Sequence, residues 1–302
     1  MAGLALIVIW LVDLGEAMAS LLAADPVLVG CGLALVQAQI ILSAIRWRFT
    51  ARRLGVSLPA SVAIAEYYLA SLLNMVLPGG VGGDAVRALR SRSALSGGAR
   101  DQSGPAIRSV ILERLAGQIA FFAIALGGLS AWPVLQASDL PEGTGTVVLI
   151  PLAVAATAIL LAIVMARLGP RAVRAWLGEL GPDMRRAWLT DGSWLAQGAL
   201  STLIALLYIA VFALSSAAVG APMEPTGWFT VIPLVLLTML VPISIGGFGL
   251  REGAAAFLWP LVGLSGAAGL AAALLYGLVS LAGALPGLFV LLKRSQTRSS
   301  RA

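Results

Sequence analysis

Long apolar segments alternate with short polar segments along the chain. Two of them, residues 27–45 and 194–218, are predominantly apolar over the length of about 20 residues that a helix needs to cross a bilayer. Residues 107–131, 146–166 and 267–292 have the same character. We predict that each is a membrane-spanning helix, because the backbone groups of a spanning segment must be satisfied internally in lipid.

The apolar pattern is weaker at the N-terminus. Residues 1–12 are apolar but too short to cross a bilayer, and Asp13 and Glu16 interrupt the continuation to Leu22. A cleaved signal peptide is not indicated, because the run lacks a basic region before it. We predict a first spanning helix over residues 1–22, and the pattern leaves open whether this helix is complete.

One pattern occurs twice, at residues 72–87 and 236–251. In each copy an apolar run is broken by proline and glycine, and an arginine follows. Interrupted apolar segments at corresponding positions of two halves indicate the binding site of a transporter. The residues that recur at a constant offset of 164 positions are Leu72, Leu73, Met75, Pro78, Gly82, Gly83 and Arg87.

The charge pattern indicates that the first copy does not cross the membrane completely. Its apolar run, residues 60–77, is followed by Arg87, Arg90, Arg92 and Arg100. A complete crossing would place these arginines outside, whereas basic residues collect on the cytoplasmic side. We therefore predict a re-entrant hairpin that enters from the cytoplasm and returns, and a second one, residues 228–251, that enters from outside.

The predicted elements form two halves, residues 27–131 and 193–292, of opposite orientation. The fold is predicted to be one all-α polytopic membrane domain, residues 1–302, with about six spanning helices and two re-entrant helix hairpins arranged as an inverted repeat. Both termini are predicted to be cytoplasmic.

The arginine-rich loop over residues 167–191 is predicted to form one or two short interfacial helices, broken at Gly181-Pro182. Two interpretations of this loop stay open: an orientation signal, or a surface for anionic lipid.

Composition agrees with a membrane protein and removes several kinds of chemistry. The 302 residues are 59% hydrophobic and 11% charged, whereas soluble domains carry about 25% charged residues. The net charge of +6 does not indicate nucleic-acid binding, because the basic residues lie in short loops between apolar runs. No histidine and a single cysteine exclude histidine-based catalysis, zinc sites and intrachain disulfides. We expect no metal or cofactor.

The two broken segments have the chemistry of an anion site. A helix restarts after each glycine pair, with Asp84 as the expected N-cap of the first and Gly249 at the start of the second. Arg87 and Arg251 lie in the first turn, where the positive helix end disfavours a cation. Two positive helix ends and two arginines would bind an anion such as phosphate. A charge inside a membrane costs at least about 2.5 to 3.5 kcal/mol and indicates a functional role.

The candidate site follows from this pattern. We assign no catalytic residue and place the hinges at Pro78 and Pro242. The substrate-binding candidates are Arg87, Arg251, Asp84, Glu252, Gly82, Gly83, Gly246, Gly247, Asn74, Glu113 and Arg114.

Simpler interpretations stay open for several of these residues. Glycine pairs are frequent where membrane helices pack closely. The simpler interpretation of Arg87 is one more cytoplasmic arginine, and that of Arg251 is a side chain that extends outward to the interface. Glu113 and Arg114 are either a self-neutralising pair or a second contact to the site. Polar residues expected to bond the broken backbone are Glu66, Asn74 and Thr238, and those expected to join helices are Gln37, Gln39, Gln118 and Gln197.

The paired motifs resemble a known family. Residues 74–87 (NMVLPGGVGGDAVR), Glu113-Arg114 and residues 242–253 (PISIGGFGLREG) are similar to the lysylphosphatidylglycerol synthase transmembrane region, also called the flippase-like domain. The resemblance covers nearly the whole chain. It implies a protein of the bacterial cytoplasmic membrane that moves a phospholipid or a polyprenyl-phosphate-linked lipid between leaflets. Aminoacyl transfer in that family belongs to a soluble C-terminal domain, so we do not expect it here.

Three hypotheses follow. The first is a translocase for a lipid or a lipid-linked head group that binds phosphate near the membrane midplane. The second is an integral-membrane lipid-phosphate transferase or its membrane subunit, which would need a base and a carboxylate cluster for a metal. The third is a scaffold that docks partner enzymes on its cytoplasmic face. The sequence leaves open the head group, the direction, the energy coupling and the oligomeric state.

Overall fold

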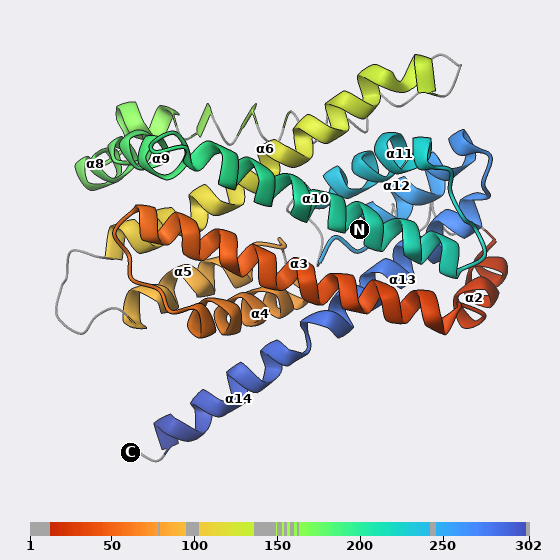
Figure 1. Cartoon of the computed structure of the whole chain (residues 1–302), viewed down its shortest axis with the longest axis horizontal. Helices are drawn as coiled ribbons and strands as arrows, with labels where there is room; N and C mark the ends of the chain where they lie inside the picture. Colours follow the sequence, from red (N-terminus) through yellow and green to blue (C-terminus); the bar gives the residue numbers. More distant parts are fainter. Residues whose placement is uncertain are drawn as a thin grey trace.

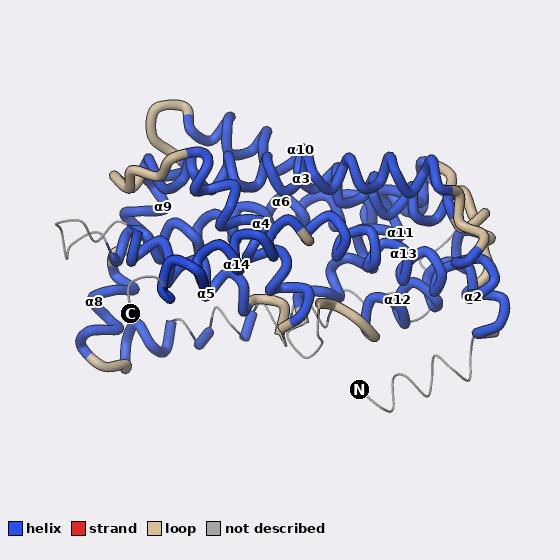
Figure 2. The backbone as a smooth tube through the Cα atoms, turned by 90° about the horizontal axis from the view of Figure 1, so that it is seen from below, coloured by secondary structure: helices blue, strands red, loops and turns tan. Residues whose placement is uncertain are grey.

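The computed structural model describes residues 13–77, 79–94, 103–135, 149, 153, 156–157, 160–161, 163–241 and 246–299. Every regular element in this part of the chain is a helix (Figures 1 and 2). The elements are α2 (Leu14–Leu22), α3 (Pro26–Arg53), α4 (Ala60–Val76), α5 (Gly82–Ala94), α6 (Ser103–Leu135), α8 (Arg171–Gly178), α9 (Leu180–Trp188), α10 (Ser193–Ala218), α11 (Pro225–Leu237), η2 (Thr238–Leu240), α12 (Leu250–Leu258), η3 (Trp259–Val262), α13 (Gly266–Ala284) and α14 (Pro286–Ser299).

Four segments of the described chain are long and apolar enough to cross a membrane: Pro26–Arg53, Gly104–Ala131, Ser193–Ala218 and Gly266–Ala284. Two shorter apolar segments, Ala60–Val76 and Pro225–Leu240, accompany them. These helices confirm the prediction of an all-α polytopic membrane protein. Of the remaining predicted spans, residues 1–12 lie outside the described residues, and residues 146–166 are described only in part.

The N-terminal acids cap helices. Asp13 precedes the short helix α2, and the first backbone N–H groups of this helix donate to its carboxylate. Its carboxylate accepts hydrogen bonds from the backbone N–H of Gly15 at 2.9 Å and of Glu16 at 3.1 Å. Asp25 caps α3 in the same way through Val27 N–H at 2.7 Å. Both acids therefore satisfy backbone donors that a helix start leaves free.

The predicted last span, residues 267–292, is two helices and not one. α13 ends at Ala284 and α14 begins at Pro286, and in Figure 1 α14 leaves the bundle at an angle. A proline lacks the N–H that would continue the helix, and its ring clashes with the preceding turn. α14 instead packs against α4, where a Cβ added to Gly287 would lie 2.5 Å from the carbonyl oxygen of Tyr68.

The arginine-rich loop forms two helices, α8 and α9, but the predicted break is displaced. The helices separate at Glu179, whereas Gly181 and Pro182 lie in the first turn of α9, where a proline removes no helical hydrogen bond. α9 is attached to the bundle by a buried ion pair, in which Arg108 of α6 donates to Asp183 at 2.5 Å. Contact of α8 with anionic lipid stays a prediction.

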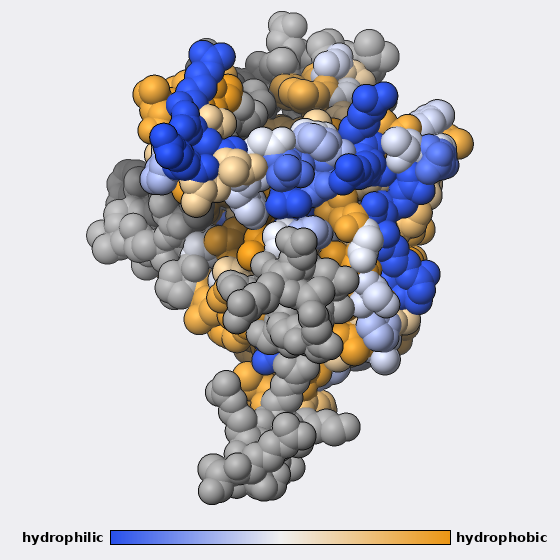
Figure 3. All heavy atoms as spheres, turned by 90° about the vertical axis from the view of Figure 1, so that its left-hand side faces the viewer, coloured by the Kyte–Doolittle hydropathy of each residue, from blue (hydrophilic) through white to orange (hydrophobic). Residues whose placement is uncertain are grey.

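Charge divides the two ends of the bundle. Figure 3 views the end formed by α8, α9 and the C-terminal turns of α3, where hydrophilic side chains gather. Exposed arginines at this basic end are Arg52, Arg171, Arg174, Arg185 and Arg186. The opposite, acidic end exposes Asp13, Glu16, Asp25 and Glu224. The separation follows the pattern by which membrane proteins are oriented.

The two broken segments lie at opposite ends of the bundle. In Figure 1 α4 and α5 pack side by side toward the basic end, while α11 and α12 lie toward the other end. The central helices α3 and α10 run antiparallel between them. The exact repeat boundaries, residues 27–131 and 193–292, stay a prediction.

Close backbone contacts fix where the two segments meet. A Cβ on Gly83 would overlap the carbonyl oxygen of Ala70, so the first turn of α5 packs directly on α4. A Cβ on Gly246 would lie 2.6 Å from the carbonyl oxygen of Met75. The glycine turn of the second segment therefore touches the end of α4 in the first. These glycines do serve close packing, as one interpretation of the sequence held.

Gly83→Ala is expected to destabilise the folded protein, because the new methyl group must displace backbone rather than a movable side chain. Overpacking of this kind costs about 1–3 kcal/mol. The apparent unfolding temperature in detergent measures the effect. Gly127→Ala is the matched control, since a Cβ there meets nothing within 4 Å and alanine favours a helix. Equal unfolding temperatures for the two variants would contradict the packing described here.

Candidate functional site

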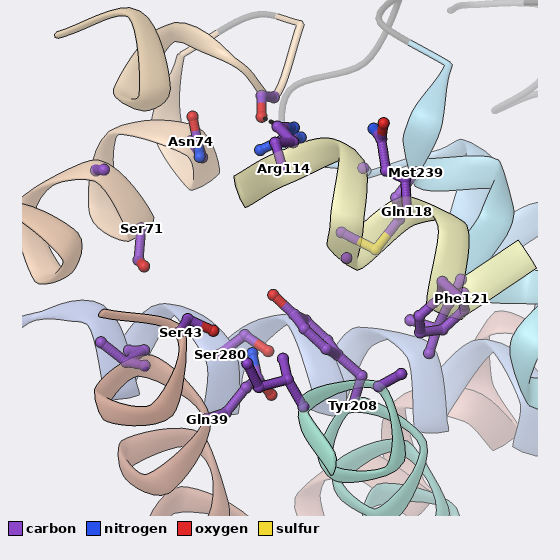
Figure 4. Close-up of a pocket in the computed structure, with 18 of the residues that line it drawn as sticks. Gln39, Ser43, Ser71, Asn74, Arg114, Gln118, Phe121, Tyr208, Met239 and Ser280 are labelled. Carbon is purple, nitrogen blue, oxygen red and sulfur yellow. Dashed lines mark hydrogen bonds between the residues drawn. The ribbon is translucent and has the colours of Figure 1, made fainter. Parts of the chain in front are cut away.

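A cavity of about 260 Å³ lies inside the bundle where the two broken segments meet (Figure 4). Its walls come from α3, α4, α6, α10 and α13, together with Gly80 of the first segment and Gly246 and Gly247 of the second. Helices distant in the sequence thus contribute to one cavity. Cavities between the helices of a bundle are a usual place for ligand sites.

Polar residues at helical spacing face this cavity. On α3, Gln39, Ser43 and Arg46 follow one another at intervals of four and three residues, which places them on one face of the helix. Tyr276 and Ser280 repeat this spacing on α13. Figure 4 shows Gln39, Ser43 and Ser280 close together below the hydroxyl of Tyr208. The polar faces of spanning helices therefore point inward, toward the cavity.

Five charged residues form a continuous chain beside the cavity. Arg46 pairs with Glu113 at 2.6 Å, and Glu113 pairs in turn with Arg87 at 2.9 Å. Arg87 pairs with Asp84 at 2.8 Å, and Asp84 pairs with Arg114. Three guanidinium groups alternate with two carboxylates, so the chain ends on an arginine at both sides and carries one net positive charge.

The centre of this chain is dry. The side chains of Arg87 and Glu113 are each 1% exposed, and Nε and Nη1 of Arg87 are buried without a hydrogen-bond partner among the described residues. Arg87 lies over the rings of Trp47 and Tyr67, at 4.7 and 4.3 Å from their centroids, an arrangement that stabilises a cation. The Tyr67 hydroxyl donates to Glu113 at 3.1 Å.

The two ends of the chain reach the cavity wall. Arg46 comes from α3 and its guanidinium lies against Gly117 of α6. A Cβ on Gly117 would lie 2.8 Å from Arg46 Nη2, so glycine at this position leaves room for the guanidinium. Its Nη1 donates to Ser201 at 3.0 Å. Arg114 comes from α6 and is 35% exposed. Each terminal arginine has only one carboxylate partner among the described residues, so both retain capacity for an anion in the cavity.

The second broken segment has its own, separate arginine site. Arg251 is fully buried and pairs with Glu252 at 2.5 Å, over the rings of Phe248 and Tyr276. Glu252 also accepts from the Gly249 N–H at 2.5 Å and so caps α12. At the repeat offset Glu113 corresponds to Gly277, which lies against the Arg251 guanidinium. The partner acid of the second arginine therefore lies on its own helix.

The structure separates the candidate residues into two groups. Those that line the cavity are Asn74, Asp84, Glu113, Arg114, Gly246 and Gly247. Arg87 and Arg251 lie behind the wall, each held by carboxylates and aromatic rings, and Gly82, Gly83 and Glu252 are not on the wall either. Arg46 and Arg114 are therefore the arginines of the described chain that line the cavity, and the anion contact of Arg87 and Arg251 stays a prediction. Pro78 and Pro242 lie outside the described residues.

Asp84 is not the N-cap of α5, which begins at Gly82. It lies in the first turn and accepts from Arg87 and Arg114. The backbone N–H of Gly83 is instead accepted by Asn74 of α4 at 2.8 Å, and the Asn74 amide donates to Asp84 at 3.2 Å. Asn74 therefore bonds the broken backbone, as predicted.

The remaining polar residues named in the sequence analysis either form hydrogen bonds and ion pairs or line the cavity. Glu66 pairs with Arg90 at 2.7 Å, and Thr238 donates to the Val235 carbonyl one turn earlier. Gln37 joins α3 to the Gly283 carbonyl at 3.1 Å. Gln197 donates to Thr50 of α3 at 3.1 Å. Gln39 and Gln118 line the cavity.

Glu113 and Arg114 do not neutralise each other. Glu113 pairs with Arg46 and Arg87, and Arg114 pairs with Asp84. Consecutive helical residues point in different directions, about 100° apart. Each therefore serves a different part of the charged chain, and a contact of either residue with a ligand stays a prediction.

Sequence reasoning missed several residues of the cavity wall. Arg46 was interpreted as one of the arginines that mark the membrane interface, but it is 4% exposed. The signal that identifies it is the polar stripe Gln39, Ser43 and Arg46 inside a span. The other missed wall residues with polar side chains are Tyr67, Ser71, Ser201, Tyr208, Tyr276 and Ser280.

An apolar wall completes the cavity. Ile40, Phe121, Ile204 and Leu237 line it together with Met239. The space is thus polar beside the arginines and apolar elsewhere. An amphiphilic molecule with a negatively charged group matches both parts.

Residues 1–287 match the family described as Lysylphosphatidylglycerol synthase TM region. No curated protein and no solved structure matches the chain.

Proposed function

Because the chain belongs to the family of the lysylphosphatidylglycerol synthase TM region, we propose that it is a translocase that moves an anionic phospholipid or a polyprenyl-phosphate-linked lipid between the leaflets of the bacterial cytoplasmic membrane. The family implies a membrane protein related to the modification or translocation of lipid head groups. The translocase activity, the anion-binding site and the location in the bacterial cytoplasmic membrane go beyond what the family implies and are proposed here.

The charged chain beside the cavity carries this proposal. Its two ends, Arg46 and Arg114, both line the cavity, and its net charge is +1. A lipid phosphate between or beside them would receive charge-assisted hydrogen bonds, for which the fork of arginine is well suited. A charged group inside an apolar bundle is costly, so an arrangement that leaves one positive charge in excess is interpreted as a functional anion site.

The placement of the cavity fits transport between two leaflets. It lies where glycine turns from opposite ends of the bundle meet, at Gly80 on one side and Gly246 and Gly247 on the other. In transporters with inverted repeats, movement of one repeat against the other opens a central site alternately to each side. We place the basic end in the cytoplasm, by the distribution of exposed arginines.

A vesicle assay tests the function. Purified protein is reconstituted into vesicles that contain a trace of fluorescent-tailed anionic phospholipid, and the exposed fluorophore is quenched by an impermeant reductant. We expect quenching beyond the outer-leaflet fraction in vesicles with the protein. Protein-free vesicles and vesicles with heat-denatured protein are the controls. Quenching that stops at the outer-leaflet fraction would contradict translocation, and a covalent lipid product detected by mass spectrometry would favour the transferase hypothesis.

A further inference from the structure

The cavity contains a second set of polar groups that the arginines do not explain. Besides the charged chain, its wall carries uncharged hydroxyl and amide groups, including those of Ser201 and Tyr208 on α10. Five further groups of this kind belong to Gln39 and Ser43 of α3, Ser71 of α4, Gln118 of α6 and Ser280 of α13. In Figure 4 Gln39, Ser43, Ser71 and Ser280 lie on the side of the cavity away from Arg114. A head group attached to a phosphate at the arginines would face this wall.

The carboxylates of the wall are already occupied. Both oxygens of Glu113 accept from arginines, Oε1 from Arg46 and Oε2 from Arg87. Asp84 accepts from Arg87 with Oδ1 and from Arg114 with Oδ2. An ammonium group in the cavity would have to compete with a guanidinium for either acid. It would also meet the excess positive charge of the chain.

We propose that the site, used as a translocase site as argued above, selects lipids whose phosphate carries an uncharged, hydroxyl-bearing head group over lipids whose head group carries an ammonium. Hydroxyl and amide side chains both donate and accept hydrogen bonds and so match a polyol, whose hydroxyls do the same. A site built to bond hydroxyls discriminates strongly against analogues that lack them, because its polar groups are then left unpaired.

The size of the cavity agrees with a head-group site. Its volume of about 260 Å³ is just below the range of roughly 300–1,000 Å³ that holds drug-sized ligands. A phosphate with a glycerol or a single sugar suits this space. The acyl chains would remain outside the cavity, in contact with lipid.

Four fluorescent-tailed lipids separate the contributions of charge and hydroxyls. Phosphatidylglycerol and phosphatidylmethanol both carry one negative charge, but only the first has head-group hydroxyls. Phosphatidylethanolamine and lysylphosphatidylglycerol carry ammonium groups. In the same vesicles we expect phosphatidylglycerol to move at least about ten times faster than either ammonium lipid, and faster than phosphatidylmethanol. A rate for lysylphosphatidylglycerol equal to or above that for phosphatidylglycerol would overturn the proposal.

A double variant tests the residues themselves. Gln39→Leu with Ser43→Ala removes hydrogen-bonding groups and leaves the charged chain intact. We expect it to lower the rate for phosphatidylglycerol more than the rate for phosphatidylmethanol, so that the two rates become equal. A purely structural effect would lower both rates equally and would overturn the assignment. If wild-type protein moves none of the four lipids, the translocase function itself fails; if it moves all four at one rate, only the selectivity does.

Discussion

Glu113→Gln is expected to destabilise the protein more than any other single neutral substitution in the charged chain. Glu113 is the only carboxylate partner of Arg46 among the described residues and one of two partners of Arg87. Removal of one partner of a buried pair costs about 3–5 kcal/mol, because the other charge stays buried without compensation. Thermal unfolding in detergent, followed by size-exclusion chromatography, should show an unfolding temperature at least several degrees below that of the wild type.

Two further variants separate this explanation from a general effect of lost charge. Asp191→Asn breaks the exposed ion pair with Arg53, in which Asp191 is 80% exposed, and we expect no measurable change, since such pairs are screened by solvent. Arg46→Gln combined with Glu113→Gln should recover part of the stability, because the uncompensated cation is removed as well. An unfolding temperature of Glu113→Gln equal to that of Asp191→Asn would show that the buried pairs contribute nothing.

Arg114→Gln is expected to reduce lipid translocation by about tenfold to a hundredfold while the protein remains folded. Hydrogen bonds to a charged group contribute about 1.5–3 kcal/mol, and each 1.4 kcal/mol is a factor of ten. The fold should tolerate the change, because Arg114 is partly exposed and Asp84 keeps its bonds to Arg87 and Asn74. The vesicle quenching rate measures the effect, with the unfolding temperature recorded for the same preparation.

Arg52→Gln serves as the matched control for this prediction. It removes the same charge from an exposed arginine at the basic end, away from the cavity wall. Translocation by this variant should equal that of the wild type. If Arg114→Gln also transports at the wild-type rate, the anion site must lie elsewhere, even if translocation itself is real. Arg251 in the second segment would then be the next candidate for the anion site.

The burial of Arg87 changes how the repeated arginine is understood. The sequence suggested that Arg87 and Arg251 bind a lipid phosphate alternately or jointly. In the structure each guanidinium lies over two aromatic rings and is paired with carboxylate, although Nε and Nη1 of Arg87 and Nη1 of Arg251 have no hydrogen-bond partner among the described residues. The repeated arginines thus hold the broken segments in place. The ends of the first chain, Arg46 and Arg114, are the cations that face the cavity.

The hydropathy of the chain alone was sufficient to predict that this is a membrane protein and to predict where most of its helices lie. α3, α6 and α10 each contain a predicted span, and α4 ends at Val76, two residues before the hinge predicted at Pro78. Local chemistry that requires no partner was also predictable, for example the helix restart at Gly249 in the second segment, whereas in the first segment α5 begins already at Gly82. Pro286 also indicates a helix break, because proline seldom continues a helix. We nevertheless predicted a single span over residues 267–292, because the apolar run continues through this proline.

The sequence by itself determined that this is an all-helical membrane protein with two similar broken segments, because apolar length and residue identity at a fixed offset are properties of the chain alone. Only the tertiary structure decided which face of each helix points inward and which charges meet. A spanning helix is apolar almost all around, so its pattern hardly fixes its rotation, and packing against neighbours sets it. Arg46 and Glu113 meet only because α3 and α6 are turned toward the same cavity.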